Sequence, residues 1–498
     1  MNVNPITRLD YPDLDVIRVE DTYYMVSTTM HFMPGCEILQ SFDLVHWEHV
    51  TYVYETLDHT DAQQLKSGQN IYGQGMWAAS LRYHEGRFYI CFVANDTRKT
   101  YLYTSEKIDG PWKKQLIEGF YHDGSLLFDE DGRNYIVYGN DEIWITELNE
   151  DLTAPKKDGL HRLLVSDHKN PELGYEGSHI QKINGYYYIF LVHSLRDRWM
   201  RTEACFYSDS LEGEFTGGDV LCDDRGYCGQ GVAQGGIVDT PDGKWYAMLF
   251  QDSGAVGRIP ILLPVTWKDH FPVFGQNGHV PEEIEVHSTR PGYIYQPLVG
   301  SDDFCNGLLP RWQFNHDPDP RYYHLDALQG TYTITTREVC TELTQAVNTL
   351  TQRMSYPSCA AEVTVDASAL KDGDVAGLCA FQGCYAAVGI TKHHGKYEVL
   401  MLDKKEDGIL DMTEGTVVES HQMDFRLEAD FCNMKDEARC YYRVNKGDWL
   451  PIGTVHKLYF KLDHFTGCRF GLFCYAAEET GGSACFRDFK YYDVDEIS

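Results

Sequence analysis

The sequence predicts an all-β protein in which a five-bladed β-propeller is followed by a β-sandwich. Five hairpin-like segments recur through about the first 290 residues, and short strands with frequent turns continue without that repeat after residue 302. Little of the chain has helical periodicity. With 498 residues, the chain is long enough for two or three domains with separate cores.

Each repeat contains a short strand, a tight turn and a second strand. The segments are VIRVEDTYYMV from Val16, LRYHEGRFYIC from Leu81, LLFDEDGRNYIVY from Leu126, HIQKINGYYYIFL from His179 and IVDTPDGKWYAML from Ile237. Asp-Gly and Asn-Gly between alternating apolar residues are hairpin signals. The tyrosines that follow the turns lie about 46 to 65 residues apart, which suits one four-stranded blade per copy. The expected domains are a propeller at 1–290, a linker at 291–301 and a sandwich at 302–498.

Composition disfavours several classes of partner. The formal net charge of −32 disfavours nucleic acids, anionic membranes and phosphorylated substrates, so a neutral ligand is the better match. The first residues, MNVNPITRLD, lack the apolar core of a secretory signal, and there is no apolar run of about 18 residues. The 15 cysteines are scattered, and even Cys222 and Cys228 are expected to be free thiols. These features favour a cytoplasmic protein.

Acidic residues precede three of the five repeats. Asp13 precedes the first, Asp123 the third and Glu176 the fourth, while Trp77 and Gln234 hold the equivalent places in the second and fifth. The first strand of a propeller blade usually lies innermost, so these five positions should surround one mouth of the central channel. A cluster of carboxylates raises the pKa of its members, and acid–base catalysis requires such a cluster whereas fold stability does not.

Hydrolysis of a glycosidic bond fits three carboxyl groups. One acid protonates the leaving oxygen, one carboxylate activates water from the opposite face, and the third orients and tunes the acid; the distance across a channel suits inversion. Each residue also has a structural interpretation: a turn cap for Asp13, an Asx-turn for Asp123 and a solvated loop acid for Glu176. Their shared repeat position favours a site. Trp77 either plugs the channel or provides a flat surface for a sugar.

The motifs PDLDVIRV, HDGSLLFDEDGR and YEGSHIQKINGYYYI, in this order, resemble glycoside hydrolase family 43. The closest type is the β-xylosidase and α-L-arabinofuranosidase group with a C-terminal, concanavalin-like β-sandwich. The resemblance implies an inverting enzyme with Asp13 as base, Asp123 as the residue that modulates pKa, and Glu176 as general acid. Leu14 replaces the proline that usually follows the base, which leaves Asp15 as a rival.

The resemblance also implies substrate contacts, from GMWAAS, VGRIPILLPV, the loop TTMHFMPG and the sandwich segment DHFTGCRFG. The residues expected to contact substrate are Met30, Phe32, Trp77, Gln234, Arg258 and Phe465. Gln234 stands where the family often has a histidine near a calcium ion. No metal ligand is therefore predicted and the chemistry needs no cofactor, while a structural Ca²⁺ in the channel is left open.

A walled pocket would admit one terminal sugar. The expected activity is release of single arabinofuranosyl or xylosyl units from the non-reducing ends of short oligosaccharides; the sequence leans toward arabinofuranosides without deciding between the two sugars. An endo-arabinanase, which needs an open cleft, a non-catalytic sugar-binding propeller and a scaffold for protein partners are the alternatives. A homo-oligomer is compatible with the sequence.

Overall fold

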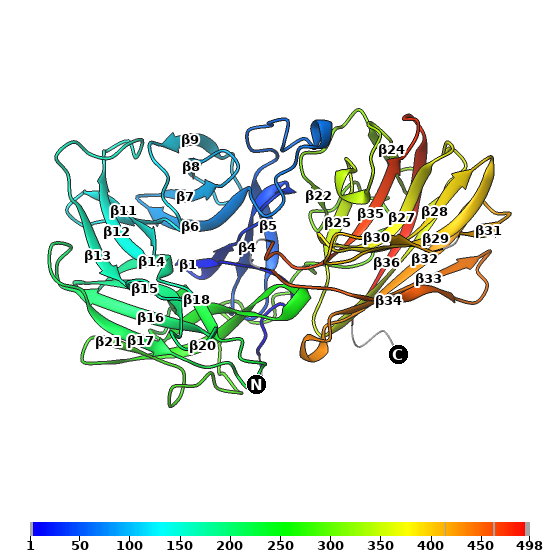
Figure 1. Ribbon diagram of the computed structural model, residues 1–498. Helices are drawn as coiled ribbons and strands as arrows, with labels where there is room; N and C mark the ends of the chain where they lie inside the picture. The colour runs from blue at the N-terminus through cyan, green and yellow to red at the C-terminus, as the bar shows by residue number, and fades with distance from the viewer. Residues whose placement is uncertain (1–2, 414, 462–463, 494–498) are drawn as a thin grey trace.

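The computed structural model describes residues 3–413, 415–461 and 464–493, and its described elements are strands and four short 3₁₀ turns (Figure 1). This confirms the predicted all-β class. Five four-stranded antiparallel sheets form the propeller. In chain order the blades are β1 (Asp15–Val19), β2 (Thr22–Val26), β4 (Gly35–Ser41) and β5 (Glu48–Tyr54); β6 (Met76–His84), β7 (Arg87–Ala94), β8 (Lys99–Ser105) and β9 (Lys113–Ile117); β10 (Ser125–Phe128), β11 (Asn134–Asn140), β12 (Glu142–Leu148) and β13 (His161–Ser166); β14 (Glu176–Ile183), β15 (Tyr186–Ser194), β16 (Arg201–Ser208) and β17 (Thr216–Leu221); and β18 (Val232–Asp239), β19 (Trp245–Asp252), β20 (Arg258–Lys268) and β21 (Phe271–Phe274).

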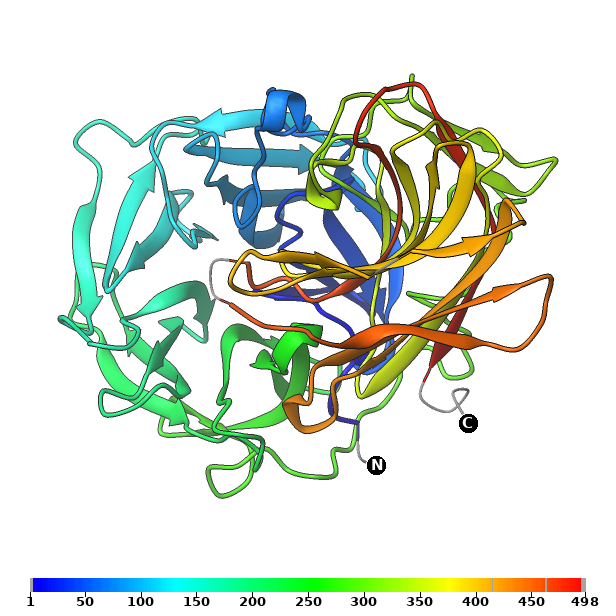
Figure 2. The same ribbon diagram turned by 45° about the vertical axis from the view of Figure 1, so that its right-hand side comes forward.

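The predicted hairpins join the two inner strands of each blade. Gly86 and Gly185, for example, occupy these turns with φ of 78° and 84°, a backbone conformation that glycine adopts without strain. The innermost strands β1, β6, β10, β14 and β18 contact one another in sequence, and β18 contacts β1, so the ring is closed. Figure 2 shows this ring, running from blue to green.

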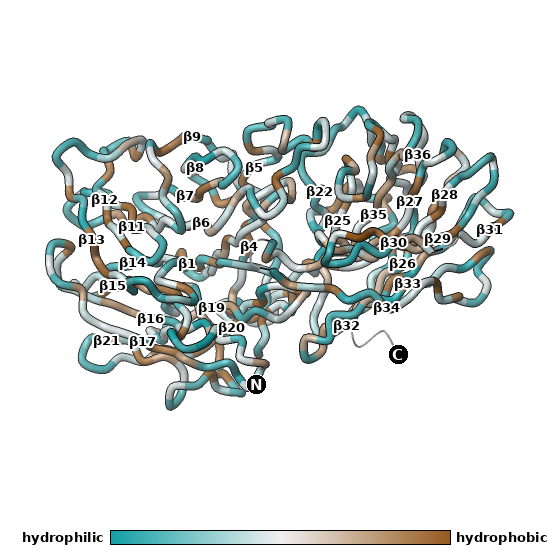
Figure 3. Tube along the Cα trace, viewed as in Figure 1, coloured by the Kyte–Doolittle hydropathy of each residue, from teal (hydrophilic) through white to brown (hydrophobic). Residues whose placement is uncertain are grey.

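Each junction between neighbouring blades has its own apolar core. The junction that closes the ring, for instance, buries Tyr23 and Met25 of the first blade against Met248 and Phe250 of the fifth. Hydrophobic residues concentrate along the strands of both domains, and hydrophilic residues prevail in the outer loops (Figure 3). Burial of apolar side chains between the blades therefore fixes their order around the axis.

Two sheets form the sandwich. The first runs in the order β3 (Phe32–Met33), β22 (Gln313–Asn315), β25 (Leu350–Arg353), β35 (Arg469–Ala476), β27 (Asp374–Phe381), β28 (Ala386–His393), β29 (Lys396–Lys404) and β30 (Leu410–Met412), and β31 (Thr416–Val418) also pairs with β29. The second runs in the order β23 (Tyr323–Asp326), β24 (Thr331–Thr335), β36 (Ser483–Asp493), β26 (Ser358–Asp366), β32 (Gln422–Asp430), β33 (Glu437–Val444) and β34 (Leu450–Lys457). The 3₁₀ turns are η1 (Lys66–Gly68), η2 (Gly254–Val256), η3 (Leu343–Gln345) and η4 (Cys432–Met434).

The connection between the domains covers residues 275–312, which include the predicted linker.

None of the helical turns in the described residues has the length and apolar character needed to cross a membrane. All 15 cysteines are free thiols, as expected from their scattered positions.

The propeller and the sandwich share a buried interface. Strand β3 leaves the propeller segment and pairs with β22, with Phe314 opposite Met33. The carboxylate of Asp10 accepts hydrogen bonds from the backbone N–H of Arg258 at 2.7 Å and from that of Gly467, in the sandwich, at 2.8 Å. Asp10 thus ties a sandwich loop to the start of a propeller strand.

Gly467→Ala should destabilise the protein by about 1–3 kcal/mol, because an added methyl group must displace tightly packed backbone. Its Cβ would lie 2.0 Å from the carbonyl oxygen of Val256 and 3.0 Å from Cβ of Asp10. Urea denaturation of the purified variant measures this loss. Gly218→Ala is the control, since a Cβ there meets nothing within 4 Å. Equal stability of the two variants would contradict the tight interface.

Candidate active site

The three predicted acids lie in one cavity. Asp13, Asp123 and Glu176 line a hollow of about 200 Å³ at one mouth of the propeller channel.

The backbone has a left-handed residue at the head of every inner strand. These residues are Asp13 (φ 50°), Ala78 (34°), Asp123 (47°), Gly177 (65°) and Gln234 (68°). In the second, fourth and fifth blades the strand register also shifts at this place. Such irregularities re-aim side chains beside active sites.

Asp13 is held between two blades. Thr28 Oγ1 donates to its Oδ2 and Arg258 Nη1 to its Oδ1, both at 2.6 Å. Arg258 Nε also donates to Asp252 at 3.2 Å, and Arg201 donates to the other oxygen of Asp252 at 2.9 Å. Burial would raise the pKa of Asp252, but the guanidinium groups of Arg201 and Arg258 outweigh the effect of burial and lower this pKa. The buried charges therefore compensate one another.

Asp15, the rival for Asp13, is fully engaged elsewhere. It accepts hydrogen bonds from Leu81 N–H and Arg82 Nη1, each at 2.7 Å, and its other oxygen lies 3.1 Å from His179 Nδ1. Burial would raise the pKa of Asp15, but Arg82 and His179 outweigh it and lower the pKa to about 2. Asp15 is not among the cavity residues, so we assign it a structural role.

Asp123 and Glu176 face a histidine that the sequence analysis did not assign. His122 Nε2 lies 3.5 Å from Asp123 Oδ2 and 3.5 Å from Glu176 Oε2. Gly177 N–H donates to Asp123 at 2.9 Å, and Asn140 Nδ2 donates to Glu176 Oε2 at 2.8 Å. Burial raises the pKa of Asp123 to about 6, whereas His122 outweighs the effect of burial at Glu176 and lowers its pKa.

The remaining wall of the cavity contains predicted and unpredicted residues. Trp77, Gln234, Arg258 and Phe465 line it as expected, together with the unpredicted His122, Leu173, Trp199 and Arg201. The centre of the Phe465 ring lies 3.9 Å from the guanidinium carbon of Arg258 and 5.2 Å from the Trp77 ring. Phe465 comes from the sandwich, so both domains build the pocket. Of the missed residues, His122 stands within the HDGS motif, directly beside Asp123.

Met30 and Phe32 require a correction, because neither lines the cavity. Met30 is completely buried, with its sulfur 3.7 Å from Thr466 Oγ1 of the sandwich. Phe32 lies in the sheet shared by the two domains, where the guanidinium of Arg469 sits 3.5 Å from its ring centre. This loop packs the domain interface instead of contacting the sugar directly.

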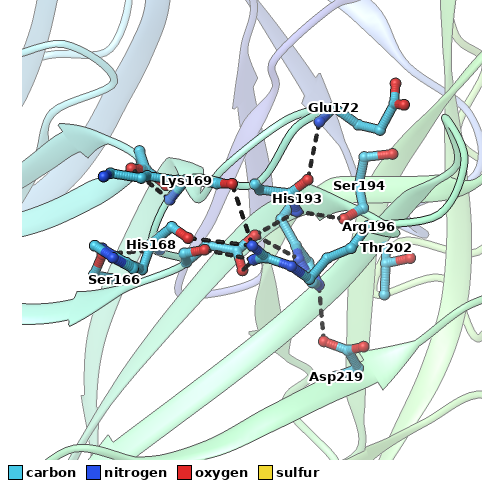
Figure 4. Close-up of polar contacts among 12 residues, drawn as sticks. Ser166, His168, Lys169, Glu172, His193, Ser194, Arg196, Thr202 and Asp219 are labelled. Atoms are coloured by element: carbon cyan, nitrogen blue, oxygen red, sulfur yellow. Dashed lines mark hydrogen bonds and ion pairs between the residues drawn. The ribbon is translucent and has the colours of Figure 1, made fainter.

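A polar network joins the segment 166–172 to the segment 193–202 (Figure 4). Leu173 and Trp199 of the cavity wall lie beside or within these segments in the sequence. His193 Nδ1 lies 3.0 Å from Asp167 Oδ2, and Nε2 lies 2.8 Å from Asp219 Oδ1. Burial lowers the pKa of His193, but Asp219 and Asp167 outweigh it and raise the pKa. Arg196 also donates to the backbone oxygen of Asp167 at 2.7 Å. The network fixes the segments on both sides of Glu176.

Two donors on cavity residues are buried without a hydrogen-bond or ion-pair partner among the described residues: Trp77 Nε1 and Arg201 Nη1. An unsatisfied buried donor costs about 1–3 kcal/mol, so such groups are rare unless a ligand uses them. Their accumulation in one small cavity indicates a site for a hydroxyl-rich ligand.

His122, Asp123 and Glu176 are also the described residues close enough to hold a metal ion, with ligand atoms within 4.8 Å of one another. The negative charge of Asp123 raises the pKa of His122 to about 9, so a metal ion bound there would have to displace that proton. Gln234, at the position where the resemblance places a histidine near a Ca²⁺ ion, lines the cavity with a neutral amide side chain.

Comparisons with known proteins agree with this geometry. Residues 3–272 match the model of glycosyl hydrolases family 43, and residues 301–492 match the β-xylosidase C-terminal concanavalin A-like domain. A β-xylosidase of Formosa agariphila is 27% identical, covering 99% of this chain and 89% of its own, and a xylosidase/arabinosidase of Butyrivibrio fibrisolvens is 24% identical, covering 99% of both.

A solved bifunctional GH43-CE protein of Bacteroides eggerthii superposes with a TM-score of 0.92 and 42% identity. The match covers 99% of this chain but only 64% of that protein. A second solved structure, an engineered GH43 enzyme with endo-xylanase and exo-arabinofuranosidase activity, has a TM-score of 0.86 and 28% identity, with 99% of both chains covered. The chain therefore belongs to glycosyl hydrolase family 43 and is a glycosidase.

Proposed function

We propose that this glycosidase acts on chain ends with inversion and releases α-L-arabinofuranosyl or β-D-xylosyl units from arabinoxylan- or xylan-derived oligosaccharides. The observation that carries the proposal is the cavity of about 200 Å³, in which three carboxyl groups meet two unpaired donors, Trp77 Nε1 and Arg201 Nη1. This volume is below the range of about 300–1,000 Å³ typical of pockets for drug-sized ligands, which suits a single sugar ring.

In this mechanism Asp13 is the base. Arg258 Nη1 and Thr28 Oγ1 each donate a hydrogen bond to one of its oxygens, which positions it to take a proton from the water that attacks the anomeric carbon. Glu176 protonates the leaving oxygen. The carboxylate of Asp123 accepts a hydrogen bond from Gly177 N–H, which places it close to Glu176 and His122.

The donors supply recognition. Arg201 Nη1 and Trp77 Nε1 would each satisfy their hydrogen-bonding capacity on a sugar hydroxyl or ring oxygen. The flat rings of Trp77 and Phe465 offer surfaces for the C–H faces of the sugar. A pocket of this kind recognises a neutral sugar, in agreement with the acidic net charge.

For the sugar itself we propose arabinofuranosides first and xylosides second. Relatives bear both names, including a xylosidase/arabinosidase and a non-reducing end α-L-arabinofuranosidase of Bacteroides ovatus. Kinetics on 4-nitrophenyl α-L-arabinofuranoside and β-D-xyloside decide the order. An endo-arabinanase would instead release oligosaccharides from linear arabinan, and a sugar-binding protein would bind without turnover. A cytoplasmic location, suggested by the reduced cysteines, belongs to the same proposal.

Asp13→Asn should lower kcat at least about 10³-fold on every substrate, because the attacking water loses its base. Steady-state rates on an arabinoxylan oligosaccharide and on a nitrophenyl glycoside measure this. Asp209→Asn, at an exposed turn, is the control and should keep full activity. Wild-type rates in Asp13→Asn would exclude Asp13 as the base.

Glu176→Gln should affect natural glycosides at least about 10²-fold more than nitrophenyl glycosides, since the nitrophenolate leaving group needs little protonation. The comparison uses kcat/KM for both substrates with the same variant preparation, which removes errors in the active fraction. An equal loss on both substrates would show that Glu176 is not the general acid.

A further inference from the structure

A second cavity, the interdomain cavity, lies between the propeller and the sandwich, and the proposed mechanism does not use it. Its volume is about 370 Å³, compared with about 200 Å³ for the catalytic cavity, and among the described residues the two share no lining residue. One wall is the propeller segment 65–72, which contains η1 and precedes β6 (Figure 1). The other wall belongs to the sandwich and includes Glu342, Gln345, Lys404 and Tyr459. Cavities that bind small molecules typically have about 300–1,000 Å³ and occur preferentially at domain interfaces.

The sandwich holds the propeller wall of this cavity in place. Arg337 Nη2 donates hydrogen bonds to the backbone oxygens of Gln64 at 2.9 Å and Leu65 at 3.1 Å, and Glu338 accepts one from the backbone N–H of Ser67 at 3.1 Å. Leu65 and Ser67 have φ of 52° and 54°, a left-handed conformation that persists in residues other than glycine only where their surroundings impose it. The two walls are therefore fixed relative to each other before any ligand binds, which lowers the entropic cost of binding.

Three aromatic rings line the interdomain cavity: those of Tyr72, Tyr459 and His464. The Tyr72 hydroxyl donates to the backbone oxygen of Thr344 and accepts from Asn315 Nδ2, both at 2.6 Å. These two bonds use the hydroxyl, so the ring is the part of Tyr72 that remains for a ligand. Its centre lies 6.0 Å from that of the His464 ring, and the two planes are inclined by 25°. Aromatic rings at fixed positions offer surfaces for the C–H faces of sugars.

Side-chain amides supply the polar groups of the cavity. Gln69, Asn70 and Gln345 line it, and the oxygens of Asn70 and Gln345 each accept a hydrogen bond from a nearby backbone N–H. Among the described residues, the NH₂ groups of these three amides have no hydrogen-bond partner. Lys404 Nζ donates to Glu342 Oε2 at 2.7 Å, so the two charges at the wall compensate each other. Amide donors beside a compensated ion pair suit the hydroxyl groups of a neutral ligand.

The interdomain cavity adjoins the catalytic cavity along the chain. His464 lines the interdomain cavity, and the next residue, Phe465, lines the catalytic cavity. The Cα atoms of consecutive residues are about 3.8 Å apart, so the two cavities adjoin at this segment. On the propeller side, Tyr72 precedes by five residues Trp77, whose ring centre lies 5.2 Å from that of Phe465. A substrate with one end in the catalytic cavity is therefore close to the interdomain cavity.

We propose that the interdomain cavity is a second saccharide-binding site, which holds an uncleaved part of a neutral xylan- or arabinoxylan-derived oligosaccharide while its end occupies the catalytic cavity. This inference rests on the proposed function and deepens it. The rings of Tyr72, Tyr459 and His464 cover the sugar faces, and the amides of Gln69 and Gln345 donate to hydroxyl groups. The catalytic cavity then recognises the terminal sugar, and the interdomain cavity adds affinity for longer substrates.

The first experiment measures binding without turnover. Linear xylotetraose is titrated by calorimetry into Asp13→Asn protein, alone and combined with Gln69→Ala or Tyr459→Ala. Gln69→Ala should raise Kd at least about twofold, because one hydrogen bond is lost, and Tyr459→Ala at least about fivefold, because a ring surface is lost. Gln74→Ala and Tyr83→Ala are the matched controls and should leave Kd unchanged, since both residues are exposed and line neither cavity.

The second experiment uses the active protein. On an arabinosylated xylotetraose, Gln69→Ala and Tyr459→Ala should raise KM by the same factors and leave kcat unchanged, because the interdomain cavity contacts no reacting atom. On nitrophenyl glycosides, which have a single sugar, kcat/KM should stay within about twofold of the wild type.

Three outcomes overturn the proposal. An unchanged Kd in both variants would show that the cavity holds only water. A raised Kd with an unchanged KM would show that it takes a separate saccharide and no part of the substrate. Equal losses on the oligosaccharide and on nitrophenyl glycosides would show that the substitutions act by disturbing the catalytic cavity through Phe465.

Gln69→Ala keeps the proposal testable if Tyr459→Ala fails to fold. Gln69 is exposed and its side chain has no hydrogen-bond partner among the described residues, so its truncation removes no internal contact of this kind. The two proposals also fail in different ways. A wild type without activity on any glycoside would refute the proposed function, whereas an active wild type with unchanged Kd and KM in the variants would refute only the second saccharide-binding site.

Discussion

Compensation of buried charge between blades is the constraint on which this structure depends. Asp13 enters the cavity from the first blade, and its cation, Arg258, comes from the fifth. Asp252 of the fifth blade is paired in turn with Arg201 of the fourth. A buried carboxylate without its partner costs about 3–5 kcal/mol, so each pair requires the blades to be in register. Closing the ring between the fifth and first blades therefore also brings Asp13 to its cation.

The sandwich completes the same site. Asp10 fixes the backbone of Arg258 and of Gly467 with its two oxygens, and Phe465 lies over the guanidinium of Arg258. The second domain thus excludes water from the cation that holds Asp13. Removal of water strengthens the electrostatic interactions within the cavity. The close packing at Gly467 keeps this contact fixed, which explains why a domain without acidic site residues is integral to the pocket.

Much of the fold and the acid cluster followed from the sequence, because both depend on local signals that repeat. The turn glycines and alternating strands give five blades, and equivalent positions in a ring must converge. The repeat could not specify the backbone at those positions. Asp13 and Asp123 are themselves left-handed, whereas Glu176 directly precedes the left-handed Gly177. The prediction that Met30 contacts the substrate was wrong for a different reason. An apolar loop can face a cavity or another domain, and Met30 contacts Thr466, which lies far along the chain. Long-range packing of this kind leaves no local pattern.

More groups than the three carboxylates determine the pKa values in this site. The sequence suggested that a neighbouring acid keeps Glu176 protonated, but its cationic neighbours outweigh burial and favour the ionised form. A neutral sugar that fills the cavity expels water and makes both charges of the His122–Glu176 pair less favourable. Desolvation lowers the pKa of an imidazole and raises that of a carboxylic acid. Binding of a sugar would therefore lower the pKa of His122 and raise that of Glu176, which favours the protonated form of the general acid.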